Sequence, residues 1–281
     1  MFERVYGMSC VENQVLALLQ KRGMDISMLY YDCAIPISAL FGSLVECGIR
    51  QEYFHQLPKS QDILKELGVI RLDLTKEPDA GRVLTRIEQN DGNAFVLARI
   101  TPEFVQKSLW AKGLRPDHYV LVQRAGSQII LTNDIPERTI QISKEEFEAC
   151  YAQEYFLLTI NRNLNSTDRE RLWNLRTFRL ERPAAFEVSM DALGNIDDFG
   201  IRLRDLAGVC KLMRYRLAEY YRHFVSTEFI YRSISLYQKY HATFEYYNLK
   251  QNIPLKRYYS LLCEMIQTDR RLLEELRRRI A

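Results

Sequence analysis

The spacing of hydrophobic residues along this chain of 281 residues changes once, from mainly strand-like alternation to a helical period. Short runs with the alternation of β-strands lie between residues 69 and 160, whereas later residues follow a helical period almost throughout. The longest helical stretch runs from Asp197 to Tyr247 and contains no proline. The pattern therefore predicts an α+β domain with an antiparallel sheet over residues 1–160, followed by a mostly α-helical domain over residues 161–281.

Within the first domain, local signals place the individual elements. Apolar side chains at helical spacing predict a helix that starts near Val11 and stops at Gly23. Ser143 and Glu146 have the spacing of a capping box, which predicts a short helix after them. Further helices are expected at residues 27–32, 60–67 and 80–89, and strands at residues 69–74, 94–100, 118–123, 128–134, 140–142 and 155–160.

Cys10 stands directly before the first predicted helix, at the end of the short loop Gly7-Met8-Ser9. A thiol in the first turn of a helix faces backbone N–H groups and the positive end of the helix dipole, which favours the thiolate. Because the thiolate is the reactive form of cysteine, Cys10 is the candidate nucleophile.

His118 and Asp134 flank a predicted hairpin that turns at Gly126. In an antiparallel pair the start of one strand lies beside the end of the next, so the two side chains can meet at one end of the sheet. A carboxylate there can accept from one imidazole nitrogen and leave the other facing a thiol. Either residue alone is explained as a turn cap. Together with the upstream Cys10 they predict a catalytic triad of Cys10, His118 and Asp134.

The composition is that of an ordinary globular protein, with 47% hydrophobic and 27% charged residues. No apolar run is long enough to span a bilayer and no export signal is visible, so a cytoplasmic location is expected. The six cysteines show no Cys-x-x-Cys spacing, which argues against a structural metal or a disulfide framework. The other five are expected to be small core residues: Cys33, Cys47, Cys150, Cys210 and Cys263.

The net charge of +3 divides unevenly, with 17 Lys+Arg against 21 Asp+Glu in residues 1–160 and 22 against 15 in residues 161–281. A basic second half predicts an acidic or phosphate-bearing partner. No nucleic-acid motif accompanies it, and no nucleic acid or membrane partner is expected. The candidate docking residues share one stretch of helical pattern, although a solvated helix face explains each of them singly: Arg202, Arg204, Lys211, Arg214 and Arg216.

The first half of the chain also resembles a known family. Ser9-Cys10-Val11-Glu12-Asn13 with its apolar helix, His118-Tyr119-Val120-Leu121-Val122 and Asn133-Asp134-Ile135-Pro136 are similar to the papain-like bacteriocin-leader peptidases, and more so to the N-terminal domain of the butirosin biosynthesis protein H family. That resemblance implies an acyltransferase that moves an aminoacyl group from the phosphopantetheine thioester of a carrier protein to an amine. It implies Cys10 as nucleophile, His118 as base and Asp134 as orienting acid, with no metal and no cofactor of its own.

One position departs from the papain-like pattern. Those peptidases place a glutamine before the cysteine for the oxyanion hole, and here Arg4 occupies that place. Backbone N–H groups at the helix start are then the expected oxyanion donors, which suits a thioester better than an amide. A cysteine peptidase or amide hydrolase is the alternative, and a non-catalytic binding protein is a third. Asn13 either orients the site or lies on the helix surface, and the surface is the expectation.

Overall fold

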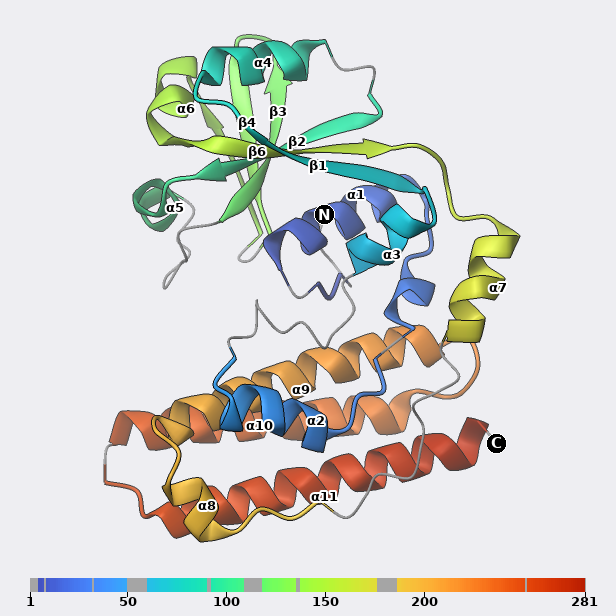
Figure 1. The fold of residues 1–281 in the computed structure, drawn as a ribbon, viewed down its shortest axis with the longest axis vertical. Coiled ribbons are helices and arrows are strands. Elements are labelled where there is room, and N and C mark those ends of the chain that lie inside the picture. The colour runs from blue at the N-terminus through green and yellow to red at the C-terminus, as the bar shows by residue number, and fades with distance from the viewer. Residues whose placement is uncertain are drawn as a thin grey trace. The chain divides into compact units, whose positions relative to one another are not determined.

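The computed structural model of the chain describes residues 5–7, 9–31, 33–49, 60–89, 92–108, 118–134, 137–175, 186–250 and 252–280. It divides into two units, one formed by Met1–Ile26 with Lys59–Asp168 and the other by Ser27–Pro58 with Arg169–Ala281 (Figure 1). The predicted combination of an α+β part with an antiparallel sheet and a helical C-terminal part is confirmed. The division differs from the predicted boundary at residue 160, because residues 27–58 group with the helices.

A six-stranded antiparallel sheet organises the first unit, in the order β1-β6-β2-β3-β4-β5. Its strands are β1 Ile70–Lys76, β2 Ala94–Ile100, β3 Tyr119–Ala125, β4 Gln128–Asn133, β5 Arg138–Ile142 and β6 Tyr151–Ile160. β3 and β4 form the hairpin predicted from the sequence, with Leu121 opposite Thr132 and a left-handed glycine, Gly126, in the turn. β6 is longer than predicted and contains an irregularity beside β2, where Gln153 has a positive φ of 60°.

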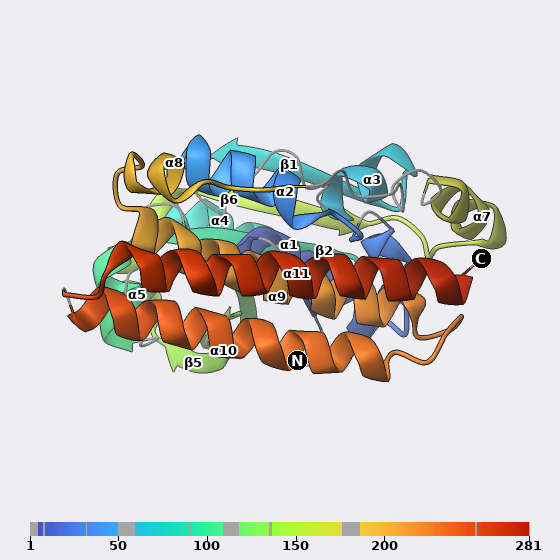
Figure 2. The same cartoon turned by 90° about the horizontal axis from the view of Figure 1, so that it is seen from below.

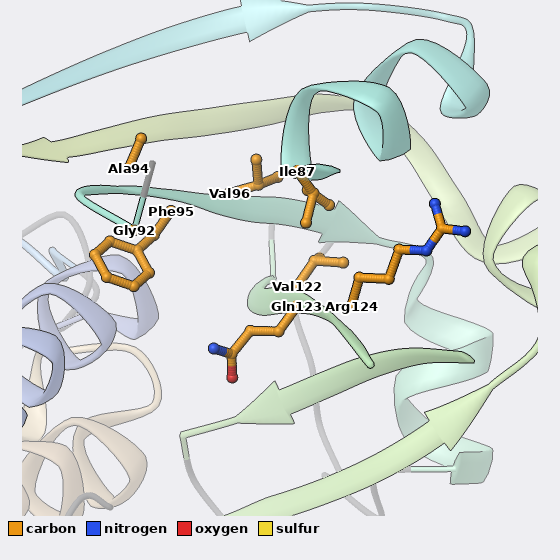
Figure 3. Close-up of a pocket in the computed structure, with 8 residues that line it drawn as sticks. All are labelled: Ile87, Gly92, Ala94, Phe95, Val96, Val122, Gln123 and Arg124. Atoms are coloured by element: carbon orange, nitrogen blue, oxygen red, sulfur yellow. The ribbon is translucent and has the colours of Figure 1, made fainter. Parts of the chain in front are cut away.

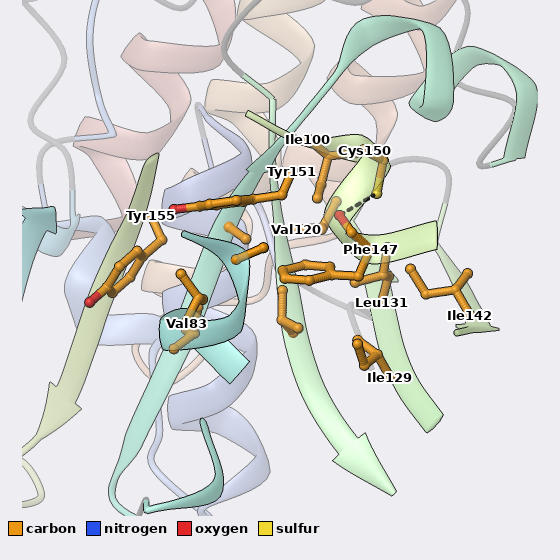
Figure 4. Packing of buried hydrophobic residues seen from close by; sticks show 14 of the residues in the cluster. Val83, Ile100, Val120, Ile129, Leu131, Ile142, Phe147, Cys150, Tyr151 and Tyr155 are labelled. Carbon is orange, nitrogen blue, oxygen red and sulfur yellow. Dashed lines mark hydrogen bonds between the residues drawn. The ribbon is translucent and has the colours of Figure 1, made fainter. Parts of the chain in front are cut away.

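Helices cover both faces of this sheet (Figure 1). α4 (Ala80–Glu88) and α6 (Lys144–Cys150) cover one face and contribute Val83 and Phe147 to a core with β2, β3 and β4 (Figure 4). The predicted capping box at the start of α6 is confirmed, since Ser143 and Glu146 each accept from the other's backbone N–H. α1 (Cys10–Lys21) packs on β3 from the other side, beside α3 (Ser60–Glu66).

One helix of this unit was not predicted from the sequence. α5 (Pro102–Ser108) follows β2 directly and begins with proline, whose missing N–H costs nothing at the first helical position. It is short and buries only Val105 among its described side chains, so its hydrophobic pattern is too weak to stand out in the sequence.

The second unit is a helical bundle built on α9 (Phe199–Tyr221), α10 (Glu228–Lys250) and α11 (Leu255–Ile280), which lie alongside one another (Figures 1 and 2). α11 begins directly after Pro254. Smaller elements complete the helices: η1 Ser27–Tyr30, α2 Ile37–Phe41, η2 Gly42–Glu46 and α8 Met190–Gly194, while α7 Ser166–Leu175 spans the division between the units. In the part of the chain that is described, no helix has the length and apolarity needed to cross a bilayer.

A buried ion pair connects the chain around the start of α2 to the long helices of the bundle. Arg214 of α9 is fully buried and pairs with Asp269 of α11. The guanidinium also donates to Ile35 O at 2.9 Å, and Asp269 accepts from Ile37 N at 2.9 Å and from the Tyr237 hydroxyl at 2.8 Å. Two buried charges are stable only with such additional hydrogen bonds, which here bind the segment before α2 to all three long helices.

The same network corrects part of the predicted docking surface. Arg214 is fully buried, and Arg216 is buried with its guanidinium 5.2 Å from the ring centre of Tyr30. Because both side chains are buried, neither can contact a partner protein. The prediction was wrong because a helical period groups residues on one face but does not show whether that face is covered. The prediction that all cysteines other than Cys10 are core residues is also wrong for Cys47, which is exposed, and for Cys263, which is partly exposed.

Candidate functional site

Cys10 is the first residue of α1, as the sequence predicted. Ser9 caps the helix, and its hydroxyl oxygen accepts from Glu12 N at 3.2 Å. The Cys10 side chain is partly exposed. The first N–H groups of any α-helix have no acceptor within the helix, so the thiol stands at the electropositive end of α1.

His118 and Asp134 meet at the end of the β3–β4 hairpin, as predicted from the antiparallel pairing. His118 immediately precedes β3, and its carbonyl accepts from Ile100 N at 3.1 Å, which fixes its backbone. Its Nε2 lies 3.9 Å from Asp134 Oδ1, and both residues are buried. That separation is an ion-pair distance and exceeds a hydrogen bond.

Asn133, the last residue of β4, lies closer to the imidazole than Asp134 does. Its Oδ1 is 2.5 Å from His118 Nε2, and its side chain has no solvent exposure. The sequence predicted Asp134 as the residue that orients His118. In the structure it is Asn133 that lies within hydrogen-bond distance of the His118 ring. The dipeptide Asn133-Asp134 therefore places one hydrogen-bond acceptor and one more distant carboxylate beside the imidazole.

Asn13 connects the cysteine helix to this hairpin. It was expected on the helix surface, but it is 4% exposed and its Nδ2 donates to Asp134 Oδ2 at 2.9 Å. Its Oδ1 accepts from Gly7 N at 2.8 Å, in the loop that leads to Cys10. A Cβ on Gly7 would lie 2.5 Å from that same Oδ1, so only glycine allows the loop to approach this closely. Cys10 and Asp134 are thus joined through one side chain located a single helical turn from the thiol.

The neighbours of Asn13 in the first turn are also buried and polar. Gln14 Nε2 donates to Thr132 O on β4 at 2.9 Å, and Glu12 Oε1 accepts from Ser60 N at the start of α3 at 2.7 Å. These bonds fix the N-terminal turn of α1 against the sheet on one side and α3 on the other. The sequence contained one signal for them, because Asn13 and Gln14 lie three and four residues after Cys10 and so share its face of the helix.

Tyr119, the residue after His118, belongs to a partly buried polar group. The pKa of Tyr119 is raised well above its usual range. The largest cause is burial, and the next is the hydrogen bond that the Tyr119 hydroxyl donates to Glu154. Arg99 acts in the opposite direction, and the negative charge of Cys10 raises this pKa further. Arg99 Nη1 is 3.7 Å from Glu154 Oε1, so cation, carboxylate and phenol form one polar group.

A separate hollow of about 190 Å³ lies between Ile87, the start of β2 and Val122–Arg124 of β3 (Figure 3). It is found at the end of β3 that is away from His118. Ligand pockets usually have volumes of about 300 Å³ or more, and no nucleophile or carboxylate lines this hollow. It does not compete with Cys10 as a reactive site.

Among the residues that the structure describes, no group of three or more His, Cys, Asp and Glu side chains is arranged to hold a metal ion. Neither a scan against protein-family models nor a search of curated proteins finds a match for this chain. Its function therefore has to be inferred from the chemistry of the cysteine, imidazole and carboxylate described above.

Proposed function

We propose that this protein is a cysteine-dependent acyltransferase that takes an acyl or aminoacyl group from a carrier-protein thioester and passes it to an amine. The observation that carries the proposal is the Asn13 bridge, which joins the first turn of the cysteine helix to the carboxylate beside His118. A helix bearing the nucleophile against an antiparallel sheet bearing the base is also the arrangement expected for a papain-like domain. A cytoplasmic location, where thiols stay reduced, is consistent with this chemistry.

The reaction would proceed in two steps. Cys10 passes its proton to His118, and the thiolate attacks the thioester carbonyl. The carbonyl–sulfur bond to the phosphopantetheine breaks, and the departing thiolate takes the proton from His118, which becomes neutral again. The acceptor amine then attacks the acyl–Cys10 carbonyl, His118 takes the proton that the amine loses, and Cys10 leaves as thiolate. Backbone N–H groups at the start of α1 would stabilise the oxyanion in both steps.

A thioester is a better donor for this site than a peptide bond. A thiolate is an adequate leaving group without protonation, whereas amide cleavage requires an acid and a strong oxyanion hole. The two side-chain amides that follow Cys10 in the first turn of α1 are Asn13 and Gln14. Their nitrogens already donate to Asp134 Oδ2 and to Thr132 O, respectively. Arg4, at the position where papain-like peptidases have glutamine, lies outside the described residues. Peptide or amide hydrolysis remains the alternative that the experiment below separates.

The carrier protein would approach a basic part of the helical unit, because carriers are acidic around their phosphopantetheine. Of the docking residues predicted from the sequence, Arg214 and Arg216 are buried. Arg202 donates to Val45 O at 2.6 Å, and Arg204 pairs with Asp205 and Glu245, so both have partners within the bundle. Exposed arginines on α11, Arg270 and Arg271, are the better candidates for the dock.

Intact-mass measurement after incubation with acyl-loaded carrier proteins tests the proposal. The expected result is a mass increase equal to the acyl group, located on Cys10 by peptide mapping and lost on addition of an amine, with formation of the corresponding amide. Cys10→Ala should abolish the adduct, and His118→Ala should lose turnover almost as fully because members of one catalytic unit act together. Cleavage of peptides with no adduct from any carrier thioester would favour the hydrolase. The absence of both acyl transfer and peptide cleavage would favour a binding protein.

A further inference from the structure

We infer that two neighbouring residues divide the support of His118, with Asn133 orienting the imidazole and Asp134 supplying the counter-charge from a second position. The inference rests on the proposed role of Cys10 and His118. It assigns Asn133 a positioning role that the sequence did not indicate, and changes the role of Asp134 from a hydrogen-bonded orienting acid to an electrostatic one.

Hydrogen-bond geometry assigns the orienting role to Asn133. The Asn133 Oδ1 to His118 Nε2 separation of 2.5 Å is that of a hydrogen bond, while the Asp134 Oδ1 to Nε2 separation is 3.9 Å. An amide oxygen can only accept, so Nε2 must carry the hydrogen. In the neutral imidazole the lone pair then belongs to Nδ1, on the opposite edge of the ring, which is the nitrogen left to take a proton from a thiol.

Asp134 is held where it can act through its charge. Its Oδ2 is occupied by Asn13 Nδ2 at 2.9 Å, while its Oδ1 is buried and has no hydrogen-bond partner among the described residues. That oxygen is the one that lies 3.9 Å from His118 Nε2. A buried carboxylate at this distance places negative charge beside the imidazolium that forms when Cys10 gives up its proton.

The other charged and titratable groups around this part of the unit do not supply the same counter-charge. Tyr119, on β3, is kept protonated by burial and by its hydrogen bond to Glu154. Glu154 on β6 is balanced by Arg99 on β2, and Glu12 on α1 accepts from Ser60 N. The Cys10 thiolate is the proposed partner of the imidazolium. Within the described part of the chain, Asp134 is the carboxylate that lies at ion-pair distance from the ring.

The pH profile of Cys10 alkylation by iodoacetate separates the two roles. This anionic reagent is attracted by an imidazolium beside the thiolate, so its rate should rise as the ion pair forms and fall as the imidazolium loses its proton. Asn133→Ala should lower the maximum rate on the order of 10²-fold, as expected for a misplaced catalytic group, with both limbs of the profile unmoved. Asp134→Asn should keep most of the maximum rate and move the upper limb to lower pH. Asn133→Asp, which keeps an acceptor oxygen, should restore most of the rate.

Two controls make the result decisive. Asn163→Ala removes an exposed asparagine side chain of the same unit and should leave the profile unchanged, and circular dichroism checks that each variant is folded. A wild-type rate in Asn133→Ala combined with near-complete loss in Asp134→Asn would overturn the inference, as would a Cys10 whose alkylation in the unchanged protein shows no upper limb. Because alkylation needs no acyl donor, failure of carrier-dependent transfer alone would reject the proposed function and leave this inference standing.

Discussion

Asn13 and Asp134 are 121 positions apart in the sequence, and the Nδ2 of Asn13 donates to the Oδ2 of Asp134 at 2.9 Å. The same asparagine accepts from Gly7 N, so a single buried side chain fixes the loop before Cys10 and the carboxylate beside His118 in one arrangement. We therefore expect Asn13 to contribute both to the stability of the folded unit and to the activity of the site.

Asn13→Ala should lower both the free energy of unfolding and the acyl-transfer rate. The change leaves Gly7 N and Asp134 Oδ2 buried without their partner, and a buried unsatisfied group costs about 1–3 kcal/mol. Urea unfolding followed by circular dichroism measures the loss. Asn163→Ala, on the surface of the same unit, should change the free energy of unfolding by less than about 0.5 kcal/mol. Equal stability of the two variants would mean that Asn13 does not hold the loop and the hairpin together.

Iodoacetamide at a limiting dose should label Cys10 before the other cysteines near pH 7. Cys47 is the demanding comparison, because it is the more exposed thiol but has no place at a helix N-terminus. Burial raises the pKa of the Cys150 thiol to about 12, and burial also raises the pKa of Cys210, so both stay protonated. Peptide mapping gives the order of labelling, and Cys47→Ser should leave the rate at Cys10 unchanged. Labelling of Cys47 first, with Cys10 inert, would remove Cys10 as the nucleophile.

Arg214→Met should destabilise the helical unit strongly. Removing one partner of a buried ion pair leaves the other charge uncompensated, at a cost of about 3–5 kcal/mol. Arg214→Met combined with Asp269→Leu should recover much of that loss, since the charge left behind is then removed as well. Thermal unfolding compares these variants with Arg232→Met, which breaks the exposed Arg232–Glu228 pair and should cost less than about 1 kcal/mol. A mild effect of Arg214→Met would show that the pair is not closed to water.

Reversing Arg270 and Arg271 together to glutamate should slow acyl transfer from a carrier protein but leave transfer from an acyl-N-acetylcysteamine unchanged. Both side chains are exposed on α11, and exposed charges act mainly on the rate of encounter. Rising salt should mimic the change with the carrier donor alone. Reversal of Lys256 and Arg257, exposed near the start of the same helix, is the matched control. Equal loss with both donors, or transfer from the carrier that does not respond to salt, would count against an electrostatic dock on this face.

The sequence by itself determined the features that depend on neighbouring residues. Cys10 at a helix start, the capping box of Ser143 and Glu146, and the hairpin around Gly126 were all predicted and are all present. Each is fixed by hydrogen bonds within a few positions, or by the alternation of side chains along a strand, so the local pattern is sufficient.

Only the tertiary structure decided which polar side chains are buried and what they contact. Asn13 was expected on the surface and is buried against Asp134, and Asn133 lies closer to His118 than the predicted Asp134 does. Arg214 was expected on a docking face and instead pairs with Asp269 inside the bundle. A helical or strand period shows which residues share a face, but a buried polar residue is stable only through partners that are distant in the sequence, and those partners come into contact only when the chain folds.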